Sequence, residues 1–192
     1  MKRTFLTAAF AALALGAAQA VSVQWTSTDT SNKTLNLTNG CGSVVAVVST
    51  PATFNNNLSS IFTVRDGLHT SYTGNAPGTT FRMAGENGSS GGKALGVTAG
   101  QGDTSFETGT STVTTEASQQ YLLAIVYNYD DATDTLTATC YIDNTVVGTF
   151  TGTKTEAPAS FNITDVHSYG TGTSVSDFFK LEQMSGYNGA LT

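Results

Sequence analysis

Charge and cysteine are scarce in this sequence. Only 11% of the 192 residues are charged, and two are cysteines. The net charge is −6, and the eight basic residues form no cluster. Nucleic acids and anionic membrane surfaces bind through basic patches that displace counterions, so the sequence excludes both as partners. The only two histidines, His69 and His167, lie far apart without a cysteine at ligand spacing, which disfavours a zinc site.

The first twenty residues have the pattern of a secretory signal. Lys2 and Arg3 precede an apolar stretch over residues 5–18, and Ala18-Gln19-Ala20 is a small-x-small cleavage site. About fourteen apolar positions are too few to span a bilayer, and no later segment approaches that length. We therefore predict a signal peptide over residues 1–20 and a protein that is secreted or lies in the cell envelope. Residues 21–192 are enough for one domain.

The two cysteines, Cys41 and Cys140, are an even number in a chain expected to be exported. In an oxidising compartment such a pair can form a disulfide. Over a loop of this length it would stabilise the fold by roughly 4–5 kcal/mol in the chain-entropy model. We expect this disulfide, and the alternative is two buried thiols that pack as small apolar side chains.

Residues 121–150 predict a strand, a turn and a further hairpin. The apolar run over residues 122–127 is typical of a strand covered on both faces. A loop over residues 128–134 follows, and then Leu136, Ala138, Cys140 and Ile142 alternate with threonines and Tyr141. This period of two places one set inward and the other toward solvent or a groove. The expected core residues are Leu122, Ile125, Val126, Leu136, Ile142 and Val147.

The rest of the chain predicts short strands separated by Gly, Asn and Asp, with no helical period. The candidate strands are residues 21–26, 33–37, 43–49, 61–65, 69–72, 79–84, 94–98, 104–107, 111–115 and 145–150. Many short strands at this spacing are typical of an all-β sandwich or jelly roll.

Two segments resemble a known family. QQYLLAIVY (residues 119–127), followed by TATCYIDNTVVGTF (137–150), is similar to laminin-G-like and other concanavalin-A-like jelly rolls, in which "YHLAVTYD" precedes "LYVDGKLVG". The closing FFKLEQMSGYNGALT (178–192) resembles that family's final strand and its "IYNRALS" ending. The family continues into a short acidic helix, whereas this chain stops at Thr192, so we expect a trimmed domain or a fragment. The resemblance implies an all-β, two-sheet antiparallel jelly-roll sandwich that binds glycans or proteins, or in some branches cleaves polysaccharide.

The acidic residues do not favour an enzyme. A retaining glycosidase needs two carboxylates about 5 Å apart, and no Glu-x-Asp-x-Glu pattern is present. The nearest pairs are Asp103 with Glu107 and Asp130 with Asp134, the second in an expected turn. Acids distant in sequence, such as Glu107 with Asp165 or Glu182, leave a dispersed pair open.

Candidate ligand groups are few. The resemblance implies calcium at a loop edge, and the densest acidic cluster, Asp130, Asp131 and Asp134, is the metal candidate, with a polar hairpin tip as the alternative. The aromatic candidates for sugar binding are Tyr72, Tyr129, Tyr141 and Tyr169, and Trp25 is also expected to be partly exposed. We therefore expect a secreted, non-catalytic module that binds carbohydrate or a cell-surface component. A glycan-active hydrolase or lyase and a structural envelope protein remain the alternatives.

Overall fold

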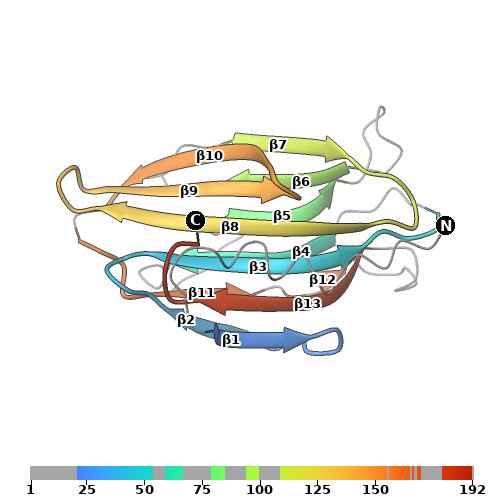
Figure 1. Cartoon of the computed structure of the whole chain (residues 1–192), viewed down its shortest axis with the longest axis horizontal. Coiled ribbons are helices and arrows are strands. Elements are labelled where there is room, and N and C mark those ends of the chain that lie inside the picture. Colours follow the sequence, from blue (N-terminus) through green and yellow to red (C-terminus); the bar gives the residue numbers. More distant parts are fainter. Residues whose placement is uncertain are drawn as a thin grey trace.

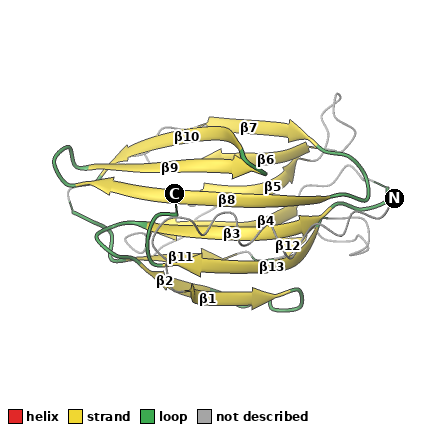
Figure 2. Cartoon of the chain, viewed as in Figure 1, coloured by secondary structure: helices red, strands yellow, loops and turns green. Residues whose placement is uncertain are grey.

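The computed structural model of the chain describes residues 21–53, 59–66, 79–84, 94–99, 109–154, 156–164, 166, 168–169 and 179–191. The described residues form strands joined by turns and loops (Figure 2). The strands are β1 (Val21–Thr26), β2 (Lys33–Asn36), β3 (Gly42–Ser49), β4 (Ser59–Asp66), β5 (Thr79–Ala84), β6 (Ala94–Ala99), β7 (Gly109–Thr114), β8 (Gln120–Asp130), β9 (Thr135–Ile142), β10 (Thr145–Thr153), β11 (Ser160–Thr164), β12 (Ser168–Tyr169) and β13 (Lys180–Tyr187). None of these residues lies in a helix long and apolar enough to cross a membrane.

The strands form two antiparallel sheets packed face to face (Figure 1). Sheet A has six strands in the order β1-β13-β3-β8-β9-β10. Sheet B has seven, in the order β2-β11-β4-β5-β6-β7, with β12 paired to β4. β1 lies near β2 at one flank of the sandwich and β10 lies near β7 at the other. The predicted all-β, two-sheet antiparallel sandwich is confirmed.

The core lies between the two sheets. Its largest fully buried side chains are Trp25, Phe62, Phe161, Phe179, Leu35, Ile61, Leu95, Leu123 and Ile125. The expectation that Trp25 is partly exposed is wrong, because the side chain is only 1% exposed. Its indole N–H donates to the Ser31 carbonyl oxygen over 2.8 Å, which satisfies the polar end of a buried ring.

β8 is buried on both faces at its centre, as its apolar run predicts. Ile125 belongs to the core, whereas Val126 is 6% exposed and lies on the opposite, outer face of sheet A. Leu136 and Ile142 of β9 are core residues, as expected. Leu122 is half-buried, and Val147 packs against the edge of the core. The core prediction therefore fails at Leu122, and Val126 is buried as expected but on the outer face, because a continuous apolar run does not show which of its residues face inward.

Other predicted strands are also present with small shifts at their ends. The expected strands 21–26, 79–84 and 94–98 correspond to β1, β5 and β6. The candidates over residues 69–72 and 104–107 lie outside the described residues. β11 was not expected from the sequence, and it joins β2 to β4 in sheet B.

Candidate functional site

A regular array of hydroxyl groups covers the outer face of the β9–β10 hairpin. Both strands carry threonine at every second position, and the pairing places three threonines of β9 opposite three of β10. The opposed pairs are Thr135 with Thr153, Thr137 with Thr151 and Thr139 with Thr149. Along each strand these side chains are about 6.8 Å apart, and between the strands they are about 4.8 Å apart. Tyr141 continues the β9 row, and these seven side chains are called the threonine–tyrosine face below.

A β-bulge creates this alignment. The two-residue turn at Asp143–Asn144 pairs Ile142 with Thr145, and the register then shifts by one residue between Val146 and Gly148. Without the shift, Thr139 would be opposite Gly148 rather than Thr149. Every later β10 side chain would then change face, because side chains alternate with a period of two. The bulge therefore turns Phe150 into the core, where it is 7% exposed, and the threonines outward.

The glycine at the bulge makes this geometry possible. A Cβ atom at Gly148 would lie 2.8 Å from Cε2 of Phe150, closer than unstrained carbon atoms approach. A side chain at position 148 would therefore have to displace the Phe150 ring, which folds against its own strand.

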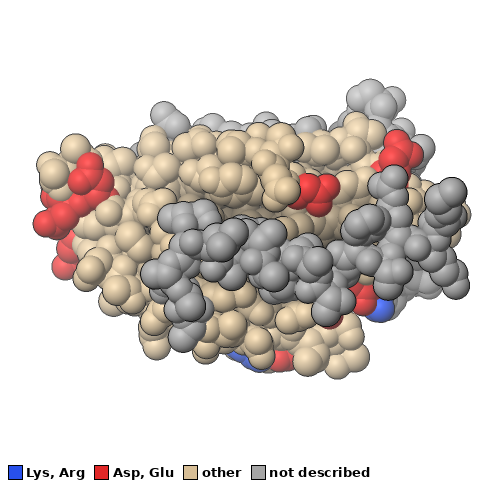
Figure 3. Space-filling model, in the orientation of Figure 1, with Lys and Arg blue, Asp and Glu red and all other residues tan. Residues whose placement is uncertain are grey.

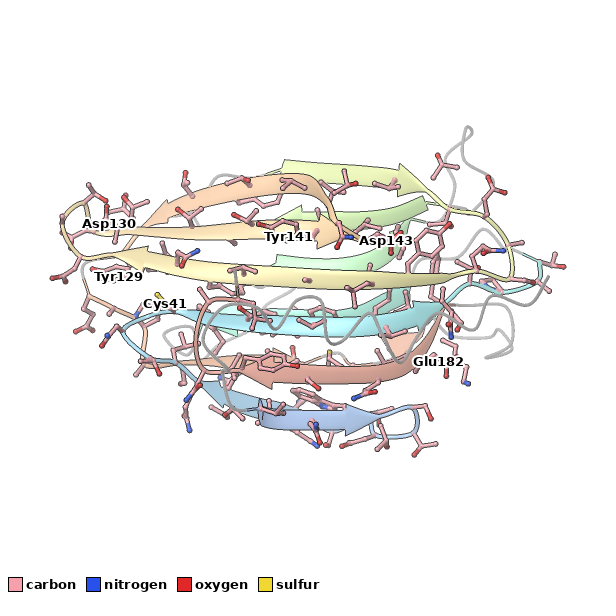
Figure 4. The ribbon with its side chains drawn as sticks, in the orientation of Figure 1. Cys41, Tyr129, Asp130, Tyr141, Asp143 and Glu182 are labelled. Atoms are coloured by element: carbon pink, nitrogen blue, oxygen red, sulfur yellow. The ribbon has the colours of Figure 1, made fainter. Side chains whose placement is uncertain are left out.

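The threonine–tyrosine face is accessible and carries no charge. Thr149 and Thr153 are exposed, and the other five side chains are half-buried. Of these seven hydroxyl groups, that of Thr135 alone makes a hydrogen bond within the described part of the chain. It donates to the Thr133 carbonyl oxygen over 3.0 Å. Acidic groups lie at the two ends of the hairpin, at Asp130 and at Asp143 (Figures 3 and 4). The face can therefore offer hydroxyl donors and acceptors and one aromatic ring to a neutral polar ligand.

The other half of sheet A's outer face is apolar and covered. Val45 and Val47 of β3 and Ala124 and Val126 of β8 face outward, yet each is at most 6% exposed. Residues 188–191 run back across β3 from the end of β13 (Figure 1). Ser43 fastens this segment: its hydroxyl donates to the Gly189 carbonyl oxygen over 3.0 Å and accepts from the Leu191 N–H over 2.9 Å.

On the outer face of sheet B, several of the described polar side chains are engaged or buried. The Thr34 hydroxyl donates to Oδ1 of Asn162, its cross-strand partner, over 3.1 Å. Thr63 is 5% exposed although it points away from the core. The threonine–tyrosine face of sheet A therefore offers more unbound hydroxyl groups among the described residues.

Of the four tyrosines expected at a sugar site, Tyr141 is the one that the structure places on an accessible face. It lies on β9 between Ala124 of β8 and Val146 of β10. Tyr72 and the side chain of Tyr169 lie outside the described residues, although the backbone of Tyr169 pairs with Ser59 in β12.

Tyr129 has a structural role. Its ring packs against the core, and its hydroxyl lies 3.1 Å from both Asp134 Oδ1 and the Lys154 carbonyl oxygen, so it can donate to one at a time. Burial, and next the hydrogen bond with Asp134, raise the pKa of Tyr129. The backbone of Gly40 approaches so closely that a Cβ there would lie 2.6 Å from the Tyr129 Cβ. Tyr129 thus fastens the hairpin loop to the sandwich instead of presenting its ring to a ligand.

The proposed metal cluster is not formed. Asp130 accepts from the Ala132 N–H over 3.0 Å and from the Thr133 hydroxyl over 2.8 Å, which closes the turn between β8 and β9. Asp134 has a positive φ of 51° and accepts from Tyr129. In the described part of the chain no group of three acidic, histidine or cysteine side chains is arranged to hold a metal ion. The metal prediction for Asp130, Asp131 and Asp134 is therefore wrong, because the carboxylates serve the turn instead of converging.

The predicted disulfide is also wrong, and both thiols are free. Cys41 immediately precedes β3, and Cys140 lies on β9, with β8 between the two strands. Two strand spacings are about 9–10 Å, whereas bridged Cα atoms lie within about 7 Å. Cys140 is buried on the inward face, as expected, and burial raises the pKa of its thiol to about 12. Cys41 is half-buried, and its thiol lies 3.6 Å from the Asn39 carbonyl oxygen.

The acids considered for catalysis are only partly described. Asp103, Glu107 and Asp165 lie outside the described residues. Glu182 is on β13, where its carboxylate accepts from the Ser49 hydroxyl over 2.8 Å and pairs with Lys180 over 2.9 Å. The Glu182 carboxylate is therefore bound by a hydroxyl group of β3 and by an ammonium group of its own strand.

Comparison with known proteins supports the architecture. No model of a known protein family matches the sequence, and no curated protein matches it significantly. Among solved structures, the metal-free carbohydrate recognition domain of Emp46p has a TM-score of 0.54 at 12% identity, covering 83% of this chain and 76% of that one. Its potassium-bound form has a TM-score of 0.53 at 11% identity, covering 88% of this chain and 83% of that one.

The fold is a concanavalin-A-like jelly roll. A CBM40 module of a Ruminococcus gnavus sialidase, bound to α2,3-sialyllactose, also matches, with a TM-score of 0.48 at 13% identity over 90% of this chain and 95% of that one.

Within this jelly roll the sequence already indicated half of the threonine–tyrosine face. The alternation in β9 placed Thr135, Thr137 and Thr139 on one side, but the matching β10 pattern Thr149-Phe-Thr151-Gly-Thr153 was not recognised. Two Thr-x-Thr-x-Thr segments separated by one hairpin turn are the signal that could have found it. This pattern alone is not sufficient, because a two-residue turn without a bulge would have placed the threonines of β9 and those of β10 on opposite faces of the sheet.

Proposed function

We propose that this protein is a secreted, non-catalytic carbohydrate-binding module that holds a neutral glycan on the threonine–tyrosine face. The observation that carries the proposal is the register of β9 and β10, which opposes three pairs of threonines beside Tyr141. Each hydroxyl can donate one hydrogen bond and accept two, and a sugar hydroxyl has the same capacity. The ring of Tyr141 supplies apolar area at low conformational cost for the face of a pyranose.

Several properties support this choice of ligand. The face carries no charge, so an ionic group on the ligand would be desolvated there without a partner. The jelly-roll fold is shared with a domain described as a carbohydrate recognition domain. Residues 1–20 have the pattern of a signal peptide, and export would bring the module into contact with extracellular glycans.

The test is a glycan array followed by calorimetric titration of the strongest neutral ligand. Tyr141→Ala should weaken binding about tenfold, equivalent to about 1.4 kcal/mol, and Tyr141→Phe should retain the stacking part. Thr34→Ala, on the outer face of sheet B, is the matched control and should bind as the wild type does. Loss of binding in Thr34→Ala with retention in Tyr141→Ala would move the site to sheet B and overturn the assignment.

Three further measurements test the proposal against its alternatives. We expect binding to be unchanged by a chelator, because the carboxylates of the hairpin tip are engaged in the turn; calcium-dependent binding would contradict a site on the threonine–tyrosine face. The purified protein should release no product from β-glucans, galactans or mucin-type glycans. Turnover that disappears when one acidic residue is changed to its amide would establish the hydrolase alternative. Sequencing of the exported protein should begin at Val21.

A further inference from the structure

One exposed amide follows the buried centre of β8. Along the outer face of this strand, Ala124 and Val126 are buried, whereas the next outward residue, Asn128, is exposed. Tyr127, which precedes it, belongs to the core, so the Asn128 side chain points away from the core. The strand continues to Asp130, so Asn128 is not part of the turn that follows. The amide is therefore presented on a regular strand at the surface of sheet A.

Asn128 borders the threonine–tyrosine face. The pairing of β8 with β9 places Asn128 opposite Thr137, and Thr137 is opposite Thr151 of β10. Opposed side chains in an antiparallel pair have Cβ atoms about 4.5–5.5 Å apart, so an amide and two hydroxyl groups form one row across three strands. Within the described part of the chain the Asn128 amide makes no hydrogen bond, whereas that of Asn162 on sheet B accepts from the Thr34 hydroxyl. The row therefore adds two N–H donors and a carbonyl acceptor to the face.

We infer that Asn128 determines which glycan the threonine–tyrosine face accepts, by holding two hydroxyl groups on adjacent carbons of one sugar ring. The inference rests on the proposed function, since it concerns the same site. A primary amide presents a donor and an acceptor side by side in one plane, and two neighbouring hydroxyls can bond to both at once. A ring that lacks one of these hydroxyls leaves part of the amide unpaired, and a site built to bond a hydroxyl rejects such an analogue.

The position of Asn128 also sets a minimum length for the ligand. Tyr141, which supplies the aromatic ring, is four residues beyond Thr137 along β9. At about 3.4 Å per residue these positions are roughly 14 Å apart, farther than one pyranose ring can span. A glycan that stacks on Tyr141 and reaches Asn128 is therefore an oligosaccharide that runs along β9 past Thr139. Its contacts with Tyr141 and with Asn128 are made by different sugar rings.

Calorimetric titration with neutral glycans of increasing length tests the inference, on the protein produced from its full-length sequence. Asn128→Ala should weaken oligosaccharide binding about tenfold. Combined with Tyr141→Ala, the two effects should multiply to about a hundredfold, because well-separated sites act independently. No monosaccharide that binds should be weakened by both substitutions. Asn36→Ala, at an exposed asparagine of β2 in sheet B, is the matched control and should bind as the wild type does.

Two further readouts identify the contact itself. Removing either of the two adjacent hydroxyls from the oligosaccharide should weaken its binding to the wild type but make no further difference to Asn128→Ala. In amide NMR spectra, the saturating oligosaccharide should shift the side-chain resonances of Asn128 and leave those of Asn162 unchanged.

The outcomes separate this inference from the proposed function. Binding that is weakened in Tyr141→Ala but unchanged in Asn128→Ala overturns the inference and leaves the proposed function standing. Weakening of one monosaccharide by both substitutions also overturns it, whereas a wild type that binds no neutral glycan overturns both proposals. If Asn128→Ala loses its circular dichroism spectrum, Asn128→Asp keeps the shape of the side chain without its N–H donors and should weaken binding in the same way.

Discussion

β9 and β10 present the same Thr-x-Thr-x-Thr pattern on one surface, but they reach it by different routes. β9 alternates without interruption, and its inward residues Leu136, Ala138, Cys140 and Ile142 all belong to the core. β10 faces inward with Gly148, Phe150 and Gly152, and it does so only after a bulge. The outward threonines of β9 therefore follow from hydrophobic alternation, whereas those of β10 depend on one irregular residue. Three of the four predictions below test these two routes, the fourth tests a turn outside both strands, and they are given in order of decreasing expected effect.

The thiol of Cys140, on the inward face of β9, should be almost completely protected from thiol reagents in the native protein. Because burial raises the pKa of Cys140 to about 12, its thiolate fraction at pH 8 is about one in ten thousand. Half-buried Cys41 should react with a thiol reagent in the native protein, and Cys140 only after unfolding. Mass spectrometry of the labelled peptides measures both rates. We expect to count two free thiols in denaturant without reductant. A count of zero would show that Cys41 and Cys140 form a disulfide.

Replacing Ile142 by Ala should destabilise the protein by about 2–5 kcal/mol, because it removes a 4% exposed side chain from the core. Thr139→Ala, on the opposite face of the same strand, should change the free energy of unfolding by less than about 0.5 kcal/mol. Denaturant unfolding of both variants provides the comparison. Similar effects in the two variants would mean that the register of β9 is wrong.

Gly148→Ala should disturb the bulge that turns the threonines of β10 outward. The added methyl group would press on the Phe150 ring, and overpacking of this kind costs about 1–3 kcal/mol. We expect lower stability by chemical denaturation together with weaker glycan binding, since the threonines of β10 depend on the bulge. Gly152→Ala is a useful comparison on the same strand. An unchanged Gly148→Ala variant would show that the bulge tolerates a side chain.

The smallest change in stability is expected at Asp29, which lies outside both strands. Hydrogen bonds from Lys33, first, and from Ser31 lower the pKa of Asp29 from 3.8 to about 2. A carboxyl with a lowered pKa stabilises the fold fully above pH 3.8, and this contribution is lost as the pH falls from 3.8 toward 2. Because the side chains of Lys33 and Asp29 keep 29% and 28% of their surface exposed, solvent screens the pair, and the contribution should be small and sensitive to salt. Asp29→Asn should remove this part of the acid dependence in unfolding curves measured between pH 4 and 2, and an identical acid dependence in the variant would refute the assignment.

Local patterns in the sequence were sufficient to predict the class of fold and several of its strands. Short strands with turn residues between them predicted the sandwich, and the apolar run of β8 predicted burial on both faces. These features depend on local periodicity, which a sequence displays directly. The inward set of β9 was correct for the same reason.

Contacts between residues distant in sequence could not be predicted and depend on how the strands assemble. Cys41 and Cys140 are separated because β8 lies between their strands, and strand order depends on contacts that no local pattern encodes. The carboxylates of Asp130 and Asp134 bond to their own turn and to Tyr129, so a cluster in sequence is not a metal site in space. The threonine–tyrosine face depends on a one-residue register shift at Val146–Gly148. That shift is stabilised by the packing of Phe150 into the core, an interaction between the two sheets that the periodicity of a single strand does not contain.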